Sequence, residues 1–261
     1  RIFTTLLEVR SGAFENADGT FTVAEVKSAA EGIVFSAPVS NIESVMIDLR
    51  SGNDQLIIHP MDLPIEVRLG SGKDTCACQS MGNTSVFGGF GEDEIHCLLA
   101  GPSRIWGGPG DDFIIASRFD DEINGGDGND DIFADDGNDI INGSYGDDYI
   151  DGQEGHDVIE GGHGADKLYG GQGIDILIGS NLQLTAWPLP DANGIRFTQS
   201  ELEQLLVDFH TNDKAGDVLR GNGDNDFIIW WRFQDTIDFP DPDGWAWWVN
   251  HLFGRVWRDA N

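Results

Sequence analysis

An aspartate recurs every nine residues through the middle of this chain, in eight consecutive copies. The eight are Asp112, Asp121, Asp130, Asp139, Asp148, Asp157, Asp166 and Asp175. An aliphatic residue stands two positions after each of them, and a glycine stands two positions before nearly every one. Glycine permits the backbone angles of a tight turn, and the aliphatic residue falls on one face of a short strand. The pattern therefore predicts a stack of repeated turn-and-strand units, in which two units close one coil.

The same phase continues upstream with a longer step. The aspartates of this step are Asp54, Asp74, Asp93 and Asp112, and each interval is one or two residues longer than two nonapeptides. The strand on the other side of each coil keeps an aliphatic residue seven positions before the next aspartate, at Val67, Val86 and Ile105. We therefore predict one continuous solenoid from Ile42 to Ile178. Its coils follow the longer step over 42–111 and consist of two nonapeptides over 112–179.

Stacked coils bring aspartates that are one coil apart directly above one another, in two rows. We call the residues of these two rows the ladder aspartates. Edge one carries Asp112, Asp130, Asp148 and Asp166, extended upstream by Asp93, Asp74 and Asp54, and edge two carries Asp121, Asp139, Asp157 and Asp175. Two carboxylates about 5 Å apart repel by roughly 3 kcal/mol at an effective dielectric constant near 20. Such rows need a counter-charge between the coils. Ligand sets made of oxygen alone favour calcium over zinc or copper, and a cage rich in carbonyl groups suits calcium better than magnesium.

The residues from about Gly88 to Gly179 resemble the haemolysin-type calcium-binding repeats of RTX (repeats-in-toxin) proteins. The nine-residue pattern is complete in Gly107–Ile115, Gly125–Phe133, Gly161–Tyr169 and Gly170–Ile178. It is looser where Ala134-Asp135, Gly143-Ser144 and Gly152-Gln153 replace the Gly-Gly pair. The resemblance implies an all-β, right-handed parallel β-roll, or β-solenoid, that binds several calcium ions between its turns. It also implies a secreted or cell-surface protein whose repeats fold when they meet external calcium.

The resemblance implies two sets of calcium ligands. The carboxylates are those of Asp93, Asp112, Asp130, Asp139, Asp148, Asp157, Asp166 and Asp175. The backbone carbonyls are those of Gly110, Gly128, Gly137, Gly146, Gly155, Gly164 and Gly173. Four further aspartates depart from the pattern and are secondary candidates: Asp121, whose turn carries Phe119 instead of glycine; Asp226, preceded by Asp224 instead of glycine; and Asp54 and Asp74, whose coils have longer loops, with Lys73 beside Asp74.

The segments outside the repeat have other patterns. Residues 1–41 are expected to form an N-terminal cap or the end of a preceding domain, and Ala13–Val23 suggests two strands joined by a turn. Residues 180–213 are expected to form a partly helical insertion, because Thr198 and Glu201 make a capping box before an apolar helical stripe. Residues 214–261 combine a degenerate repeat with a Trp-rich cap, in which Trp245, Trp248, Leu252 and Val256 fit one helical face.

The composition excludes several partners. The 261 residues carry a formal net charge of -31, which argues against nucleic acid and against an anionic membrane surface. No run of about 18 apolar residues is present, so membrane insertion is not expected. The sequence starts at Arg1 without a methionine, and we expect a processed form or a piece of a longer protein. Other domains of such a parent protein, or an extracellular polysaccharide, are the remaining candidate partners.

The cysteines and histidines carry less information. Cys78 and Cys97 both lie four positions after a ladder aspartate, so they stack on adjacent coils and suit either a disulfide or, as we prefer, core positions shared with Cys76. His156 and His163 fall on variable repeat positions, where we expect side chains to face solvent. The chain has no HExxH, GxSxG, phosphate-loop or dinucleotide motif.

Two classes of function remain open. The first is a non-enzymatic calcium-binding module for folding, secretion or adhesion. The alternative is the non-catalytic part of a secreted RTX-type enzyme such as a protease, lipase or uronate epimerase. A polysaccharide-active β-helix enzyme is a third interpretation, but it needs clustered basic residues, and the upstream strands offer only the scattered Arg50, Arg68 and Arg104.

Overall fold

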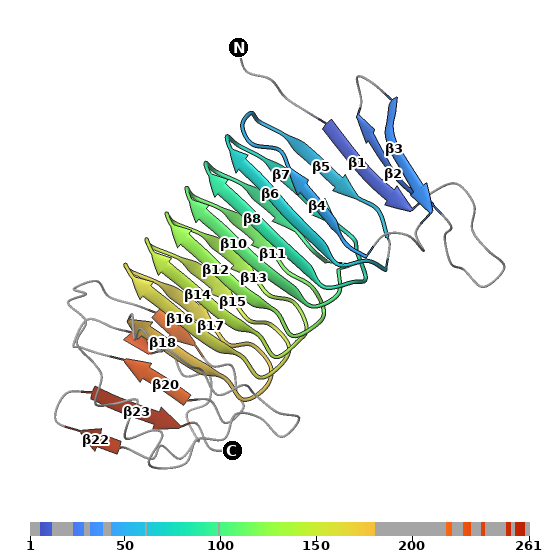
Figure 1. Ribbon diagram of the computed structural model, residues 1–261. Coiled ribbons are helices and arrows are strands. Elements are labelled where there is room, and N and C mark those ends of the chain that lie inside the picture. Colours follow the sequence, from blue (N-terminus) through green and yellow to red (C-terminus); the bar gives the residue numbers. More distant parts are fainter. Residues whose placement is uncertain are drawn as a thin grey trace.

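The computed structural model describes residues 43–60, 62–98 and 100–180, together with eight shorter strands near the two ends of the chain. These residues form a β-solenoid of about seven turns, and the described part of the chain contains no helix (Figure 1). Within the same residues, no helix is therefore long and apolar enough to span a membrane. The predicted fold class, a parallel β-roll or β-solenoid, is confirmed.

The coils follow one another as alternating strands. Those of the solenoid are β4 (Val45–Asp48), β5 (Gln55–Ile58), β6 (Ile65–Ser71), β7 (Thr75–Cys78), β8 (Thr84–Phe90), β9 (Glu94–His96), β10 (Ser103–Pro109), β11 (Phe113–Ile115), β12 (Glu122–Asp127), β13 (Asp131–Phe133), β14 (Ile140–Tyr145), β15 (Tyr149–Asp151), β16 (Val158–His163), β17 (Lys167–Tyr169) and β18 (Ile176–Ser180). The end strands are β1 (Leu6–Ser11), β2 (Val23–Ser28), β3 (Gly32–Pro38), β19 (Val218–Arg220), β20 (Phe227–Trp230), β21 (Thr236–Ile237), β22 (Val249–His251) and β23 (Gly254–Arg258).

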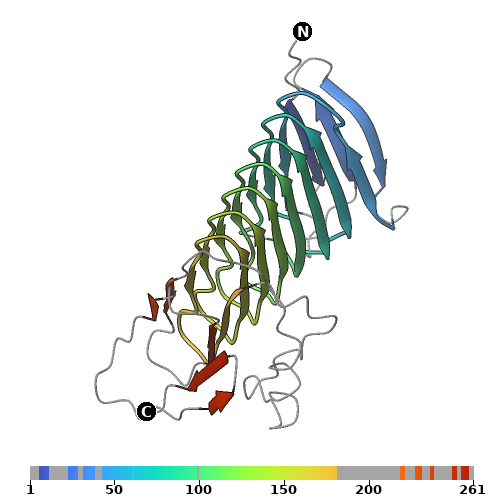
Figure 2. The same ribbon diagram turned by 90° about the vertical axis from the view of Figure 1, so that its left-hand side faces the viewer.

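The strands form two sheets that face each other along the whole solenoid. Strands β5, β7 and the odd-numbered strands up to β21 lie in the first sheet, and β4, β6 and the even-numbered strands up to β20 lie in the second. Every neighbouring pair in these two series is parallel, and Figure 2 shows the successive coils stacked along one axis. Each coil therefore consists of one strand from each sheet and the two turns that join them.

The strand register confirms the coil lengths predicted from the aspartate spacing. In the first sheet, Leu56 is aligned with Cys76 and Cys76 with Ile95, so the early coils keep the longer step. From Ile114 to Ile132 the step shortens to two nonapeptides, and it keeps this length as far as β17. The repeat also resumes after the insertion, because Leu219 of β19 and Ile228 of β20 continue the two aliphatic columns.

The core is a double column of aliphatic side chains between the sheets. The residues two positions after the ladder aspartates are at most 2 % exposed: Ile114, Ile123, Ile132, Ile141, Ile150, Ile159, Leu168 and Leu177. The coils differ in the size of their core. Strands β6 and β7 bury five apolar side chains (Ile65, Val67, Leu69, Cys76 and Cys78), whereas β14 and β15 bury two (Ile141 and Ile150).

The three cysteines belong to this core. Cys76, Cys78 and Cys97 are buried among the aliphatic side chains and are free thiols in the structure, as the preferred interpretation expected. Cys78 and Cys97 continue the register of β7 and β9, so they occupy equivalent positions on adjacent coils. Translation along the stack keeps their Cβ atoms about 4.8 Å apart, longer than the 3.5–4.5 Å that a disulfide requires.

The turns need positive φ at two positions. At the turn glycine, for example Gly128 (φ 136°), the preceding coil approaches so closely that a Cβ would collide with the carbonyl oxygen of Gly110. At the second residue of the repeat, the same left-handed region is kept by residues other than glycine: Asp135 (φ 74°), Ser144 (φ 86°) and Gln153 (φ 72°). The looser repeats therefore retain the backbone of the complete ones, at the expense of some strain.

Antiparallel strands lie at the two ends of the stack. Strand β1 pairs in parallel with β5 and antiparallel with β2, which pairs with β3. At the other end, β23 pairs antiparallel with both β20 and β22. The helical face predicted through Val256 is wrong, since Val256 lies in strand β23. Val256 and Trp257 both favour an extended strand, and the edge of β20 offers backbone partners.

Some predicted features lie outside the described residues. These are the turn predicted within Ala13–Val23, the helical insertion over 181–213 and the tryptophans at positions 245, 247 and 248. Strands β1 and β2 nevertheless flank the segment in which the turn was predicted, and they pair with each other. The division of the chain into a cap, two kinds of coil, an insertion and an aromatic tail stays a prediction.

Replacement of a core residue tests the packing of the late coils. Ile132→Ala removes a side chain that is fully buried, and we expect it to lower the free energy of unfolding by about 2–5 kcal/mol because a cavity remains. The matched control is Glu122→Ala on the exposed outer face of the neighbouring sheet, which removes only an exposed ion pair with Arg104 and should lower stability by no more than about 1 kcal/mol. Denaturant unfolding followed by tryptophan fluorescence measures both, and equal losses would contradict the core assignment.

Candidate metal sites

The ladder aspartates occupy equivalent points on the two edges of the solenoid. On edge one, each aspartate ends the turn from the second sheet to the first, as Asp112 does between β10 and β11. On edge two, each ends the return turn, as Asp139 does between β13 and β14. The parallel register of the strands then places every aspartate over the equivalent residue of the next coil. All eight predicted carboxylate ligands are at most 2 % exposed.

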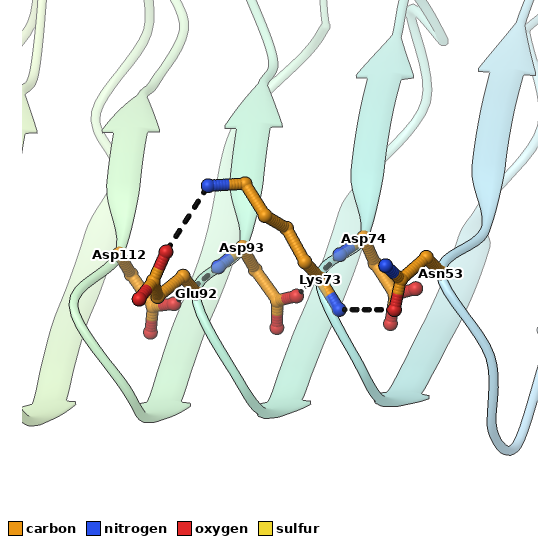
Figure 3. Close-up of polar contacts among 6 residues, drawn as sticks. All are labelled: Asn53, Lys73, Asp74, Glu92, Asp93 and Asp112. Carbon is orange, nitrogen blue, oxygen red and sulfur yellow. Dashed lines mark hydrogen bonds and ion pairs between the residues drawn. The ribbon is translucent and has the colours of Figure 1, made fainter. Parts of the chain in front are cut away.

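One oxygen of each carboxylate is tied to the neighbouring coil. The backbone N–H of Asp112 donates to Asp130 Oδ1 at 2.8 Å, and the same bond recurs at 2.6–3.0 Å along both edges. Figure 3 shows three carboxylates of edge one in this arrangement, those of Asp74, Asp93 and Asp112. These bonds fix the orientation of the carboxylate plane, and therefore also the direction of its second oxygen.

In seven of these carboxylates the second oxygen, Oδ2, is left without a hydrogen bond. These are the buried side chains of Asp74, Asp93, Asp112, Asp130, Asp139, Asp148 and Asp157. A buried carboxylate oxygen without a donor is strongly unfavourable when the group is ionised. A regular series of such atoms, each in the same position of its turn, calls for a positive charge or a proton beside each one.

The same burial changes the acidity of these groups. Removal from water raises the pKa of Asp112 to about 7, that of Asp130 to about 8 and that of Asp139 to about 10. Burial also raises the pKa of Asp93 and Asp148 to about 6 and that of Asp157 to about 7. Neighbouring ladder carboxylates add to the effect, because ionisation of one disfavours ionisation of the next.

A small space lined by oxygen lies beside most of these unpaired atoms. A Cβ placed on Gly107 would collide with Asp112 Oδ2 and with the carbonyl oxygen of Gly125 on the next coil. The glycine therefore leaves room for something other than a side chain. We call this space, between a ladder Oδ2 and the carbonyl of the following coil, the cradle. The same collision with the ladder carboxylate recurs at Gly88, Gly125, Gly143, Gly152, Gly161 and Gly170.

The cradle suits a hard cation. Its donors are carboxylate and carbonyl oxygens, the ligands that calcium prefers. No group of three or more His, Cys, Asp or Glu side chains converges anywhere in the described ranges. A cation in the cradle would therefore take much of its coordination from the backbone. The turn glycines contribute to this backbone surface, since the carbonyl of Gly110 points along the stack at Gly128, and that of Gly128 at Gly146.

The first glycine of each repeat was not among the predicted ligands. Sequence reasoning selected the turn glycine two positions before each aspartate, whereas the carbonyls that face Oδ2 belong to residues five positions before an aspartate, such as Gly125 and Gly143. The fixed spacing of five residues was present in the repeat, but only the stacking of the coils shows which carbonyl faces the carboxylate.

The secondary candidates differ in their surroundings. Asp121 is satisfied internally, because its Oδ2 accepts hydrogen bonds from the N–H and the Oγ of Ser117, both at 2.8 Å. Asp74 and Asp54 continue the row of edge one, and the N–H of Asp54 donates to Asp74 Oδ1. Asp226 lies outside the described residues.

A second row of polar bonds, which the sequence did not suggest, runs beside the aspartates. It uses the residue just before each ladder aspartate and has the opposite direction. On edge one, the N–H of Asn129 donates to Asp111 Oδ1 and the N–H of Asp147 donates to Asn129 Oδ1, both at 2.8 Å. On edge two, the N–H of Ile174 donates to His156 Nδ1 at 2.7 Å. Successive turns are therefore joined in both directions.

The expectation that His156 and His163 simply face solvent is wrong. His156 is half-buried and takes part in the second row of bonds, and His163 stacks on Tyr145 with ring centroids 4.8 Å apart. Stacked coils bring equivalent side chains within reach of each other, which an isolated turn would not do.

The arginines do not form a basic cluster. Arg68 pairs with Glu66 at 2.6 Å and Arg104 pairs with Glu122 at 3.0 Å, on strands β6 and β10 that are separated by β8. Arg50 lies in a turn with φ 70°. The arrangement that a polysaccharide-active site on the early coils would need is not formed by these three residues.

Comparison with known proteins agrees with this geometry. A family model for the RTX calcium-binding nonapeptide repeat, which spans four copies, matches residues 106–141, 142–177 and 215–237. The chain carries RTX calcium-binding nonapeptide repeats. The RTX match covers the late coils, where the cradles recur, and also the region of β19, β20 and β21 that resumes the register. No curated protein matches the chain.

The pKa shifts predict how the metal-free RTX coils respond to pH. The raised pKa values of Asp112 and Asp130 belong to the folded state, whereas an unfolded aspartate titrates near about 3.9. Below about pH 4 both states are protonated, and stability is lost as the pH rises toward 8, because the folded state must then ionise buried groups. We expect calcium-depleted protein to melt at least about 4 °C higher at pH 5 than at pH 7.5, measured by circular dichroism. A melting temperature that rises with pH would contradict the arrangement.

Proposed function

We propose that this chain is an extracellular calcium-binding β-roll, in which calcium completes the fold of the RTX coils. The observation that carries the proposal is the series of buried, unpaired Oδ2 atoms, five of which lie beside a carbonyl of the next coil. Seven of the eight predicted ligands share the cradle glycine: Asp93, Asp112, Asp130, Asp148, Asp157, Asp166 and Asp175. Bound calcium supplies positive charge to these carboxylates. The chain orients Oδ2 through the bond to Oδ1 and keeps water away by stacking its coils.

The small core of the late coils supports the coupling of folding to calcium. A coil such as β14–β15 orders two whole nonapeptides but buries only two large aliphatic side chains. Ordering each residue opposes folding by about 1–2 kcal/mol, and each buried aliphatic side chain returns only about 1.5–3 kcal/mol. Backbone pairing contributes further, but the same pairing forces the carboxylates together. A late coil therefore gains most from a cation that removes this repulsion.

The affinity expected of such sites supports an extracellular location. Extracellular calcium modules bind with dissociation constants of about 10⁻⁴–10⁻³ M, which external calcium satisfies and cytosolic calcium does not. RTX repeat proteins are generally secreted or associated with a surface. Repeats of this type are typically structural, calcium-binding units. We therefore propose a structural role in folding, secretion or adhesion, either alone or beside other domains of a parent protein.

Calcium removal tests the coupling directly. With excess EDTA at pH 7.5 we expect the β-sheet signal in far-UV circular dichroism to fall, because the late coils lose their counter-charge. We expect the signal to return on calcium addition with a midpoint between about 0.1 and 1 mM. Magnesium at the same concentrations is the control and should restore little. A β-rich spectrum that is identical in chelator and in calcium would sink the proposal.

A single ladder substitution tests the role of one carboxylate. Asp130→Asn keeps the Oδ1 acceptor for Asp112 but removes the charge at Oδ2. We expect calcium affinity to fall at least about tenfold, equivalent to about 1.4 kcal/mol, while the metal-free protein becomes more stable at pH 7.5 because a buried charge is gone. The matched control is Asp131→Asn on the adjacent exposed residue, which should change neither quantity. Isothermal titration and thermal melting measure the two effects.

A further inference from the structure

The residue five positions before each ladder aspartate is glycine in some turns and a larger residue in others. It is glycine in the turns of the seven aspartates named above, and each of these glycines lies against the Oδ2 of its own aspartate. In four other turns it carries a side chain: Leu49 before Asp54, Leu69 before Asp74, Ala116 before Asp121 and Ala134 before Asp139. Leu49 is partly buried, and the other three side chains are buried.

The side chain at this position occupies the cradle. In the glycine turns, a Cβ would overlap the carboxylate oxygen, and in five of them also the carbonyl of the next coil. Ala134 has that Cβ, so the space beside Asp139 is filled by a methyl group. The Oδ2 of Asp139 remains buried and unpaired, and so does that of Asp74 beside Leu69. A cation cannot reach either oxygen by the route that is open at Asp157.

In the turn at Asp121, polar groups of the chain also occupy the carboxylate oxygens. Ser117 donates through its N–H and its hydroxyl to Oδ2, and the N–H of Ser103 on the preceding coil donates to Oδ1 at 2.5 Å. Ser117 also lacks the positive φ that the second residue of the other turns adopts. Both carboxylate oxygens of Asp121 therefore already accept hydrogen bonds from the chain, in the place where a cation would bind.

The turn at Asp74 has a cation of the chain itself. Lys73 is the only lysine or arginine that directly precedes a ladder aspartate. Its ammonium group reaches the next coil and lies 3.1 Å from Glu92 Oε2, while its backbone N–H donates to Asn53 Oδ1 (Figure 3). The charge of Lys73 therefore lies on the exposed surface beside Glu92, on the coil that follows Asp74.

We propose that the residue five positions before each ladder aspartate decides whether that turn accepts a cation. Glycine opens the turn, and Leu69, Ala116 and Ala134 close it. Calcium then enters edge one from Asp93 onward but edge two only at Asp157 and Asp175, and Asp139 is not a ligand although its nonapeptide is otherwise regular. The inference rests on the proposed calcium binding, and it assigns the sites within the ladder.

Two opposite substitutions on edge two test the assignment. Ala134→Gly should open the cradle at Asp139 and raise the number of bound calcium ions by one. Gly152→Ala should close the cradle at Asp157 and lower the number by one; Gly152 has no positive φ, so alanine strains only the cradle. Ala165→Gly, in the turn of Asp166 but outside its cradle, is the matched control and should leave the number unchanged. Native mass spectrometry of the full chain in excess calcium counts the ions.

The outcomes separate this inference from the proposed function. An Ala134→Gly protein that keeps the wild-type number of ions overturns the cradle assignment, provided that wild type binds calcium. A wild-type chain without bound ions overturns the proposed function instead. Circular dichroism in saturating calcium shows whether Gly152→Ala is folded. If it is not, the gain expected for Ala134→Gly still decides the matter, because that change removes a methyl group and leaves the strands intact.

Discussion

The stacking of like-charged carboxylates, imposed by the backbone, is the constraint on which the rest of the structure depends. Parallel pairing in register leaves each aspartate no choice of neighbour: Asp112 must lie over Asp130, and Asp130 over Asp148. Separation of the charges would require the strands on both sides to unpair. A backbone hydrogen bond from the neighbouring coil stabilises one oxygen of these carboxylates. In most turns a glycine leaves space beside the other oxygen. The turn, the glycine and the aspartate therefore act together as one structural unit.

The balance between core and charge changes along the solenoid. The early coils are longer, and the coil of β6 and β7 buries five apolar side chains and has Leu69 where most later turns have glycine. The late coils are shorter, and the coil of β14 and β15 buries two aliphatic side chains. In the turn of Asp121, Ser117 provides the hydrogen-bond donors to Oδ2. The two kinds of coil thus share one backbone geometry but rely on different forces.

The fold could be predicted from the sequence because each nine-residue repeat of the sequence corresponds to one turn and one strand of the solenoid. The period of nine determined the coil length, and the aliphatic residue two positions after each aspartate identified the core, as Ile114 and Ile132 show. Features that depend on contacts between coils could not be predicted in this way. The donors of Ser117, the row of bonds through Asn129 and His156, and the carbonyl of Gly125 beside Asp112 are all consequences of stacking. The strand at Val256 was missed because helical spacing in a short aromatic segment does not exclude an extended backbone next to an open sheet edge.

The antiparallel strands at the ends have a consequence for association between molecules. A stack of parallel coils is an open template, to which another copy could add its own coils without limit and so form a fibre. Here the first sheet ends in β2 and β3 at the N-terminal side, and the second sheet ends in β23 and β22 at the C-terminal side. At each end, one of the two sheets has reversed its direction. Among the described strands, only one of the two sheets at each end therefore continues in the parallel direction, which disfavours the addition of further coils from a second copy.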